Sequence, residues 1–352
     1  MKWVPFLSSQ VLYTHKGHIM IPDHKVIIVG AGLAGLIAAH RFPQAQIIDA
    51  ATPENKERHN ALLRFRSPVI GQLTGIPFRE VTVHKAIYID GEFVPQPRID
   101  YCNMYSRKVT GGLSDRSIWN LATEKRWIAP ADYYEQLVAK LANRISWGRP
   151  FDASFFQFLR RQDDHVNIIS TAPFRANLAA AGLDLGIDPS FGEGTSIVVS
   201  RYKLSIPCDV FQTVYFPGPE VGTFRASITG DTLIVESVTK GVVETADGEI
   251  KTIEWDSNWD LDEVCSAFGI RKKNLIPDGD PTIQTKGKII PLGRDERESM
   301  IWNLTHEAGI FSLGRFATWR NVLLDDLVSD MDVIERLMTS SSYQKAKKMF
   351  VK

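Results

Sequence analysis

Cysteine is scarce in this 352-residue chain, which has only Cys102, Cys208 and Cys265. The three are widely spaced and odd in number, and no two form a C-x-x-C pair. This pattern excludes a disulfide framework and a cysteine-based zinc or redox-dithiol motif. It favours a reducing compartment, so we expect a cytoplasmic protein.

Net charge is also absent, because Lys plus Arg and Asp plus Glu both number 41. No global field therefore draws the chain to nucleic acid or to an anionic membrane, although this does not exclude a local basic patch. DNA is thus a partner that the net charge does not indicate. Long apolar runs are missing too, and polar residues interrupt the first 20 positions, unlike a signal peptide or a membrane span. We expect no membrane association, and the sequence leaves the oligomeric state open.

What the chain does contain is the start of a dinucleotide-binding unit. The apolar run Val26–Val29 predicts a buried parallel strand, and Gly30, Gly32 and Gly35 fill a G-x-G-x-x-G turn that leads into a helix over Leu33–Arg41. A lone G-x-G-x-x-G also occurs at ordinary turns, but here a strand precedes it and a helix follows. The sequence therefore predicts a Rossmann-type βαβ unit.

Each glycine of this fingerprint has a mechanical task. Gly30 permits the tight turn, Gly32 lets the backbone approach a pyrophosphate, and Gly35 lets helix and strand pack closely. The first backbone N–H groups of the helix, at Leu33 and Ala34, are expected to face the phosphates, where the helix dipole favours negative charge.

Three further positions are expected to touch the cofactor. A second apolar strand ends in Asp49, about 20 residues after the first glycine, where a carboxylate accepts hydrogen bonds from an adenosine ribose. The run Val166–Ser170 predicts a central strand whose end, Thr171, lies at the nucleotide. Arg64 lies in an alternating apolar and basic segment and is a candidate phosphate clamp, with a solvated face as the alternative. Neighbouring candidates of the same kind are His59 and Arg66.

The middle of the chain predicts a second sheet. Val81–Ile89 and Glu92–Val94 flank an Asp-Gly turn, which predicts a hairpin. Four short strands between residues 196 and 237, separated by Pro, Gly and Gly-Asp turns, predict an antiparallel sheet. Helices are expected at Ser114–Ala129, Tyr133–Ile145, Leu261–Phe268, Ile301–Ala308 and Leu324–Met338.

The expected fold class is therefore α/β: a Rossmann-type FAD-binding domain with a parallel sheet, plus an antiparallel-sheet substrate domain with short helices. We predict that the first domain is discontinuous and that a short tail follows it. The predicted boundaries are 1–60, 131–190 and 281–340 for the first domain, 61–130 and 191–280 for the second, and 341–352 for the tail. This interrupted layout is typical of two-domain flavoproteins more than of nicotinamide dehydrogenases.

Four segments resemble UDP-galactopyranose mutase, in the same order along the chain. They are the hairpin at Ala86–Phe93, the strands at Ile168–Pro173 and Gly222–Ile228, and Gly314–Asn321, which is similar to the family's G-R-L-x-x-Y-x-Y motif. Together with the N-terminal fingerprint, the resemblance implies an FAD-binding flavoprotein related to this family and to the amine-oxidase superfamily.

The resemblance also implies functional residues. Arg225 and Arg315 would hold a substrate anion over the flavin, since planar guanidinium forks match oxyanions bidentately; two surface salt bridges are the alternative. Trp319 would lie near the isoalloxazine as a wall or a stacking platform. The implied cofactor contacts of the same region are Gly314, Arg315, Leu324 and Asp325.

The chain also departs from the family. The family's histidine-rich segment is missing, and its helical substrate region is much shortened. Thr123–Trp127 looks like the family's T-E-K-Q-W uridine-stacking motif, but it lies immediately before Pro130, where the family has a different segment. We therefore expect Trp127 to be a core or domain-interface aromatic. The resemblance thus supports the identity of the cofactor more than the identity of the substrate.

The leading hypothesis is an FAD-dependent oxidoreductase or lyase that oxidises an amine or amino-acid-like group on a small molecule or a modified nucleotide, with flavin N5 as hydride acceptor. Small flavin-dependent phage lyases that act on hypermodified thymidine in DNA are similar in size and class, although no motif carries this step; the location would then be the host cytoplasm. One alternative is a mutase-like isomerase, without net redox, that acts on a nucleotide sugar. Another is a flavin-binding protein without catalysis. Nicotinamide binding is the weakest alternative, because no second nucleotide fingerprint follows.

Overall fold

A five-stranded sheet lies at the centre of the first domain, in a computed structural model that describes residues 26–55, 62–113, 118–162, 166–183, 195–206, 209–244, 250–254, 261–289 and 292–340. Its strands are β1 (Val26–Val29), β2 (Gln46–Ile48), β7 (Ile145–Ser146), β8 (Asn167–Ser170) and β17 (Ile310–Ser312). Every strand pair is parallel. The spatial order β7-β2-β1-β8-β17 is the 3-2-1-4-5 order of a Rossmann sheet.

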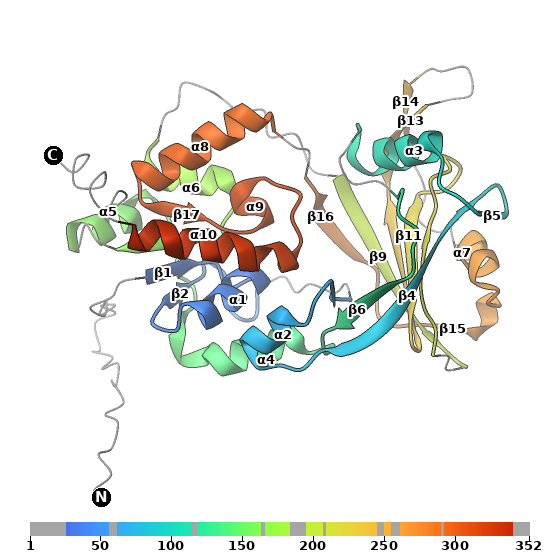
Figure 1. The fold of residues 1–352 in the computed structure, drawn as a ribbon, viewed down its shortest axis with the longest axis horizontal. Helices are drawn as coiled ribbons and strands as arrows, with labels where there is room; N and C mark the ends of the chain where they lie inside the picture. Colours follow the sequence, from blue (N-terminus) through green and yellow to red (C-terminus); the bar gives the residue numbers. More distant parts are fainter. Residues whose placement is uncertain are drawn as a thin grey trace, which may run out of the picture.

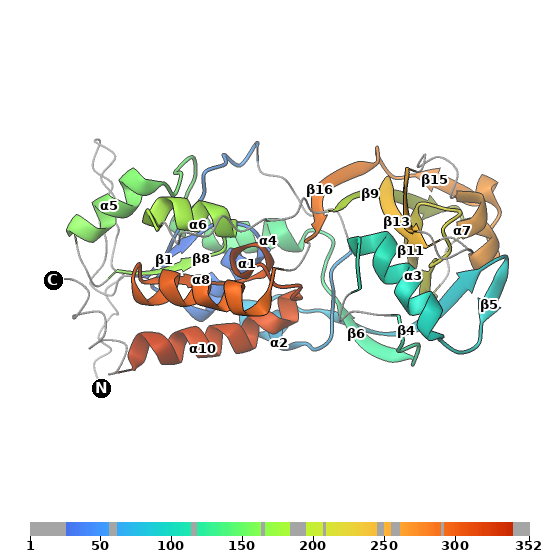
Figure 2. The same cartoon turned by 90° about the horizontal axis from the view of Figure 1, so that it is seen from above.

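Helices cover both faces of this sheet (Figures 1 and 2). One apolar core packs under the helices α1 (Leu33–Arg41), α2 (Val69–Thr74), α4 (Tyr133–Leu141) and α10 (Leu327–Thr339). The opposite core packs under α5 (Ala153–Gln162), α6 (Phe174–Ala181), α8 (Arg294–His306) and α9 (Arg315–Thr318). All four residues of β1 are buried, as expected for a parallel strand with helices on both sides.

The second domain contains a curled ten-stranded sheet with the main order β15-β9-β12-β11-β10-β4-β6-β3. Its strands are β3 (Arg64–Phe65), β4 (Arg79–Ile89), β5 (Glu92–Val94), β6 (Glu124–Ile128), β9 (Thr195–Leu204), β10 (Phe211–Tyr215), β11 (Thr223–Thr229), β12 (Thr232–Val238), β15 (Leu275–Pro277) and β16 (Thr282–Lys288). Most pairs are antiparallel, but β10 pairs with β4 in parallel. The expected antiparallel sheet is therefore a mixed one. A separate hairpin joins β13 (Lys240–Glu244) to β14 (Ile250–Glu254).

The two faces of the second sheet have different covers. Tyr88 belongs to the core that packs under α7 (Leu261–Phe268), whereas its neighbour Ile87 belongs to the core that packs under α3 (Ile99–Thr110). Successive strand residues point to opposite faces, so these cores lie on opposite sides. Both views show α7 at the end of the molecule far from the parallel sheet. We call the side opposite α7 the inner face; it is turned toward the first domain.

Several predicted elements are confirmed and one is wrong. The helix expected over Tyr133–Ile145 ends earlier, at Leu141, and Ile145 begins strand β7. The hairpin is β4 with β5, and the four short strands are β9 to β12. The helix expected over Ser114–Ala129 is wrong in its described part, because Glu124–Ile128 is strand β6, paired with β4. Pairing with a long neighbouring strand outweighs the weak helical spacing. Local sequence patterns did not predict the elements α2, α3, α5, α6 and the β13–β14 hairpin.

Two segments pack away from the domain to which the predicted boundaries assign them. Ile70 of α2 lies in the core of the first domain, and β16 pairs with β9 of the second sheet. Among the described residues, no helix is both long enough and apolar enough to cross a bilayer. Cys102 and Cys265 are buried cysteines, and Cys208 lies outside the described residues.

A buried lysine fixes the β10–β11 connection beneath α3. Lys108 is fully buried, and its ammonium group donates to the backbone carbonyls of Phe216, Gly218 and Thr223 at 3.0, 2.7 and 2.8 Å. An ammonium carries three protons, so these carbonyls match its donor capacity. The contact ties α3 to the edge of β11.

Replacing Lys108 with Met should lower the free energy of unfolding by about 2–3 kcal/mol, because buried carbonyl groups lose their donor. Denaturant unfolding measures the change. Lys140→Met is the matched control, since Lys140 is exposed and makes one 3.2 Å bond to Gly75. Equal stability of the two variants would contradict a structural role for Lys108.

Candidate functional site

The fingerprint turn lies where the strand order of the parallel sheet reverses, between β1 and β8. Gly30 follows β1 and Thr171 follows β8; the Thr171 hydroxyl donates to the carbonyl of Val29 at 2.8 Å. Gly30 has a φ of 99°, and a side chain there would place its Cβ 2.4 Å from the Thr171 hydroxyl. Only glycine fits this turn, and ligands of open α/β sheets bind at this reversal point.

Gly35 and Gly32 differ in what surrounds them. A Cβ on Gly35 would lie 1.9 Å from the carbonyl oxygen of Gly30, so α1 packs directly on the turn. A Cβ on Gly32 would meet nothing within 4 Å. Gly32 begins α1 without a side-chain cap, and the first turn of the helix has no acidic residue. The structure thus leaves open space beside uncapped helix N–H groups, which is the arrangement that binds phosphate.

Asp49 is held at the end of β2 by two backbone donors. Its carboxylate accepts from the N–H groups of Ala31 at 2.6 Å and Ala51 at 2.8 Å, and the residue is only 5% exposed. The carboxylate therefore lies beside the fingerprint turn, as the sequence predicts. Tyr134 of α4 donates from its hydroxyl to the carbonyl of Ala31 at 3.1 Å. No sequence pattern predicted this second support of the turn.

The C-terminal motif packs against the same helix start. Gly314 has a φ of 85°, and a Cβ there would lie 3.2 Å from the Cβ of Ala34. Trp319 adopts a left-handed backbone with φ 46° and is 8% exposed in the core under α6 and α8. Most of the Trp319 ring is therefore in contact with protein. Its predicted role beside the isoalloxazine stays a prediction.

A 3₁₀ turn, η3 (Leu324–Asp326), precedes α10. The carboxylate of Asp325 accepts from the backbone N–H groups of Arg66 at 2.8 Å and Ser67 at 3.3 Å. The side chain of Arg66 also forms an ion pair with Asp326. The predicted flavin contacts at Leu324 and Asp325 thus lie next to the segment that carries Arg64.

Three consecutive residues join the two domains. Arg64 donates to the hydroxyls of Thr213 at 2.8 Å and Ser227 at 2.9 Å in the second sheet. Phe65 is buried in the first domain's core, stacked on Phe78 with ring centroids 4.7 Å apart. Because Arg66 reaches η3, this short segment contacts the second sheet, the first core and the C-terminal motif in succession.

Arg225 and Arg315 come from different domains. Arg225 on β11 makes a bidentate ion pair with Glu236 on β12, one bond being 2.6 Å. Burial alone would lower the pKa of Arg225, but Glu236 outweighs burial and raises it. Arg315 begins α9, and its guanidinium donates to the carbonyl of Val322 at 3.3 and 3.4 Å. The arginine pair over a flavin therefore stays a prediction.

The structure brings together the residues predicted for the nucleotide half of the site. Gly30, Gly32, Leu33, Ala34, Gly35, Asp49, Thr171 and Gly314 all lie at the carboxyl ends of β1, β2, β8 and β17 or at the start of α1. Trp127 packs against the first core, as expected of a domain-interface aromatic. Glu236 was missed: it lies in β12, where all seven residues are buried, and strand register places it opposite Arg225. His59 lies outside the described residues.

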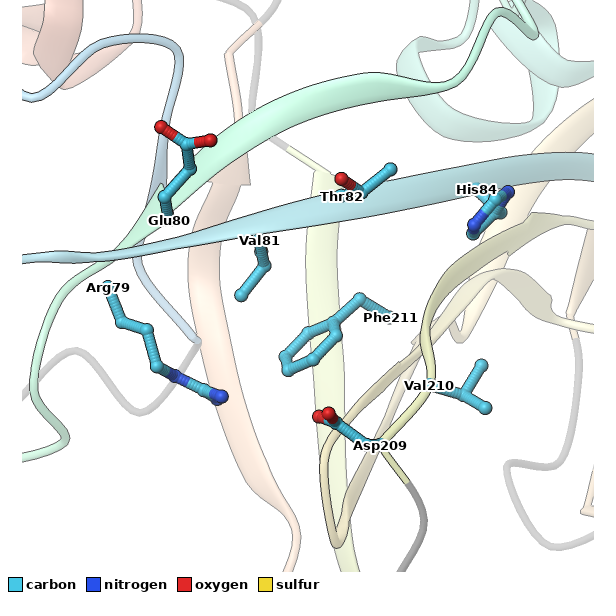
Figure 3. A pocket seen from close by; sticks show the side chains of 8 residues that line it. All are labelled: Arg79, Glu80, Val81, Thr82, His84, Asp209, Val210 and Phe211. Atoms are coloured by element: carbon cyan, nitrogen blue, oxygen red, sulfur yellow. The ribbon is translucent and has the colours of Figure 1, made fainter.

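A hollow of about 380 Å³ lies elsewhere, where the start of β10 separates from β4 (Figure 3). Val81 and Phe211 form its apolar wall, and the guanidinium of Arg79 lies 4.9 Å from the centre of the Phe211 ring. No residue of the fingerprint lines this hollow, so we do not assign the predicted nucleotide site to it.

Comparisons with known proteins show a shared fold. Scans against protein-family models and curated proteins find no match. The CLA-producing fatty acid isomerase from P. acnes aligns with a TM-score of 0.55 at 11% identity, covering 89% of this chain and 98% of that one. The PF1083 protein from Pyrococcus furiosus gives 0.53 at 11%, covering 91% and 99%. A ternary complex of aklavinone-11 hydroxylase with FAD and aklavinone gives 0.46 at 12%, covering 91% and 63%. At these identities the likeness concerns the fold alone: a parallel-sheet domain joined to a second sheet domain.

Gly35→Ala should lower the free energy of unfolding by more than about 3 kcal/mol, since the added Cβ meets backbone that cannot move aside. Thermal or denaturant unfolding measures the loss. Gly112→Ala is the matched control, because a Cβ there meets nothing within 4 Å, and it should change stability by less than about 0.5 kcal/mol. A Gly35→Ala variant as stable as the control would overturn the close packing of α1 on the turn.

Proposed function

We propose that the protein binds FAD and acts as an FAD-dependent oxidoreductase on a small molecule. The observation that carries this proposal is the uncapped start of α1 beside the open space at Gly32. Helix N–H groups in that setting recognise phosphate oxygens. The 3-2-1-4-5 strand order and the second sheet domain fit a dinucleotide with a substrate domain beside it.

Three groups of this chain would hold the cofactor. The N–H groups at Leu33 and Ala34 would receive the pyrophosphate, and Asp49 would bind the adenosine ribose. The turn at Gly314 lies against Ala34 and would border the flavin half. When bound, the flavin supplies an acceptor for two electrons and a proton.

For the substrate we propose an amine or amino-acid-like group, on a free small molecule or on hypermodified thymidine in DNA. The support is the resemblance to amine-oxidase-type flavoproteins and the shortened helical substrate region. Arg225 and Arg315 are the residues proposed to orient the substrate anion, with Trp319 as an aromatic wall. An isomerisation of a nucleotide sugar without net redox, and flavin binding without catalysis, are the alternatives that the experiments below separate from this proposal.

Gly32→Val should weaken FAD binding while the fold stays intact, because a Cβ at this position meets no protein atom within 4 Å and the side chain would occupy the open space at the helix start. We expect FAD affinity to fall at least about tenfold, equivalent to about 1.4 kcal/mol. Flavin content after gel filtration and equilibrium titration of the apoprotein with FAD give the affinity. Gly112→Val serves as control. Full FAD affinity in the Gly32 variant would contradict the proposed cradle.

Anaerobic addition of a true amine substrate should bleach the absorbance of the oxidised flavin, because an oxidation must transfer two electrons in each turnover. Oxygen or another acceptor should then restore the absorbance. Candidate substrates are amino acids, followed by glycine-bearing thymidine in DNA.

The two alternative functions predict different changes in flavin absorbance and product in the same experiment. An isomerase would turn over a UDP-sugar only after prior reduction of the flavin and with no net change in absorbance. A flavin carrier would show neither bleaching nor product. Either record, with no amine that bleaches the flavin, would overturn the oxidative proposal.

A further inference from the structure

A band of charged and hydroxyl side chains crosses the inner face of the second sheet. Strand register places its members on one side: Thr213 pairs with Lys85 and Ser227, Tyr215 with Arg225, and Arg225 with Glu236. On β6, Glu124 pairs with Val83, two residues before Lys85, and Arg126 with Val81. We call these polar side chains, together with Arg64, the polar band.

Positive charge exceeds negative charge in this band. Four cations (Arg64, Lys85, Arg126 and Arg225) face two carboxylates (Glu124 and Glu236). Lys85 and Arg126 share Glu124, the Lys85 contact being 2.8 Å, and Arg225 is paired with Glu236. The chain as a whole has no net charge, so the surplus is local.

Arg64 is the cation of the band whose recorded partners are neutral. Its two terminal nitrogens donate to the hydroxyls of Thr213 and Ser227, which lie 3.1 Å from each other. Among the described residues, no carboxylate lies within ion-pair distance of this guanidinium. Burial, with a contribution from nearby Arg225, lowers the pKa of Arg64 to about 10, which leaves it charged at neutral pH. A guanidinium has five N–H donors, so two hydroxyls do not use its capacity.

We propose that Arg64 binds the carboxylate of the substrate on the inner face of the second sheet. The inference rests on the proposed function and names the anchor and charge of its substrate. Arg225 is a positioning residue here, because Glu236 holds it in an ion pair. The three side chains Arg64, Arg225 and Glu236 together carry a charge of +1. That charge matches one carboxylate, which the planar fork of Arg64 can bind bidentately.

Aromatic side chains and the core of the first domain lie around the arginines of the polar band. The rings of Tyr105 and Tyr215 pack edge to face beside Arg225, with centroids 5.6 Å apart, and burial raises the pKa of Tyr105, which keeps its hydroxyl neutral. Because Phe65 is fixed in the core of the first domain, Arg64 is held at the junction of the domains. As a residue, Arg64 is of intermediate exposure, so it is not sealed from solvent.

A flavin phosphate is the other oxyanion that Arg64 could meet, and the test separates the two sources. The probe is acetate, with acetamide as its uncharged isostere, at constant ionic strength on the FAD-loaded protein and on the apoprotein. The readout is Tm, which rises when a ligand binds the folded state alone. FAD affinity of each variant is measured in parallel.

Wild type should show a saturable rise of Tm with acetate and none with acetamide. Arg64→Gln should weaken the apparent acetate affinity at least tenfold at unchanged FAD affinity, and Arg64→Lys should retain part of it because the charge stays. Arg201→Gln, which removes a half-buried arginine paired with Asp278 on the same sheet, should behave as wild type.

Three results would overturn the proposal: no saturable acetate effect in wild type, the same effect in Arg64→Gln, or a tenfold loss of FAD affinity in Arg64→Gln with the acetate effect intact. The last result would assign Arg64 to a flavin phosphate. Wild-type protein that binds no FAD but responds to acetate through Arg64 would refute the cofactor and leave the carboxylate site standing. The two failures are therefore distinguishable.

Discussion

The rest of the first domain depends on the contact between α1 and the turn that precedes it. The carbonyl of Gly30 lies so close to Gly35 that no side chain fits between them, and this sets the height at which the helix crosses the sheet. The helix start then meets Gly314 from the other end of the chain, while Asp49 accepts from Ala31 within the turn. A shift of α1 would disturb all of these contacts together. The glycines therefore act as spacers of the fold as well as openings for a ligand.

Domain association depends on a different constraint, the segment Arg64-Phe65-Arg66. An extended strand sends successive side chains in opposite directions, so Arg64 can reach the second sheet while Phe65 enters the first core. Arg66 adds an exposed ion pair with η3, which contributes little to stability on its own. The buried ring of Phe65 is the stronger tether, since burying an aromatic side chain contributes about 1.5–3 kcal/mol. A hydrophobic contact thus holds a cation at the junction.

Structural features that depend on local sequence patterns could be predicted, whereas pairings between strands that are distant in the sequence could not. The fingerprint, Asp49 and the Asp-Gly hairpin follow from spacing over a few residues or over one βαβ unit, and the structure has all three. Strand β6 could not be found in this way, because its partner β4 lies far back in the sequence and the local spacing resembles a helix. The partners of Arg64 lie 149 and 163 residues away. Glu236 was missed because opposing residues across antiparallel strands are fixed by register.

Register also changes the meaning of the predicted arginine pair. A sheet that places Arg225 opposite Glu236 gives the fork of that guanidinium a bidentate carboxylate, so Arg225 would orient a substrate anion as one half of an ion pair and not as its main anchor. Arg64 differs in that hydroxyls orient it without neutralising it. Burying a charge without an oppositely charged partner is costly. Arg64 lies at the domain junction with neutral hydroxyl partners, so a bound anion would reduce this cost. The difference between these two arginines lies in the strand opposite each of them, and the neutral partners of Arg64 are what allow it to bind a substrate carboxylate.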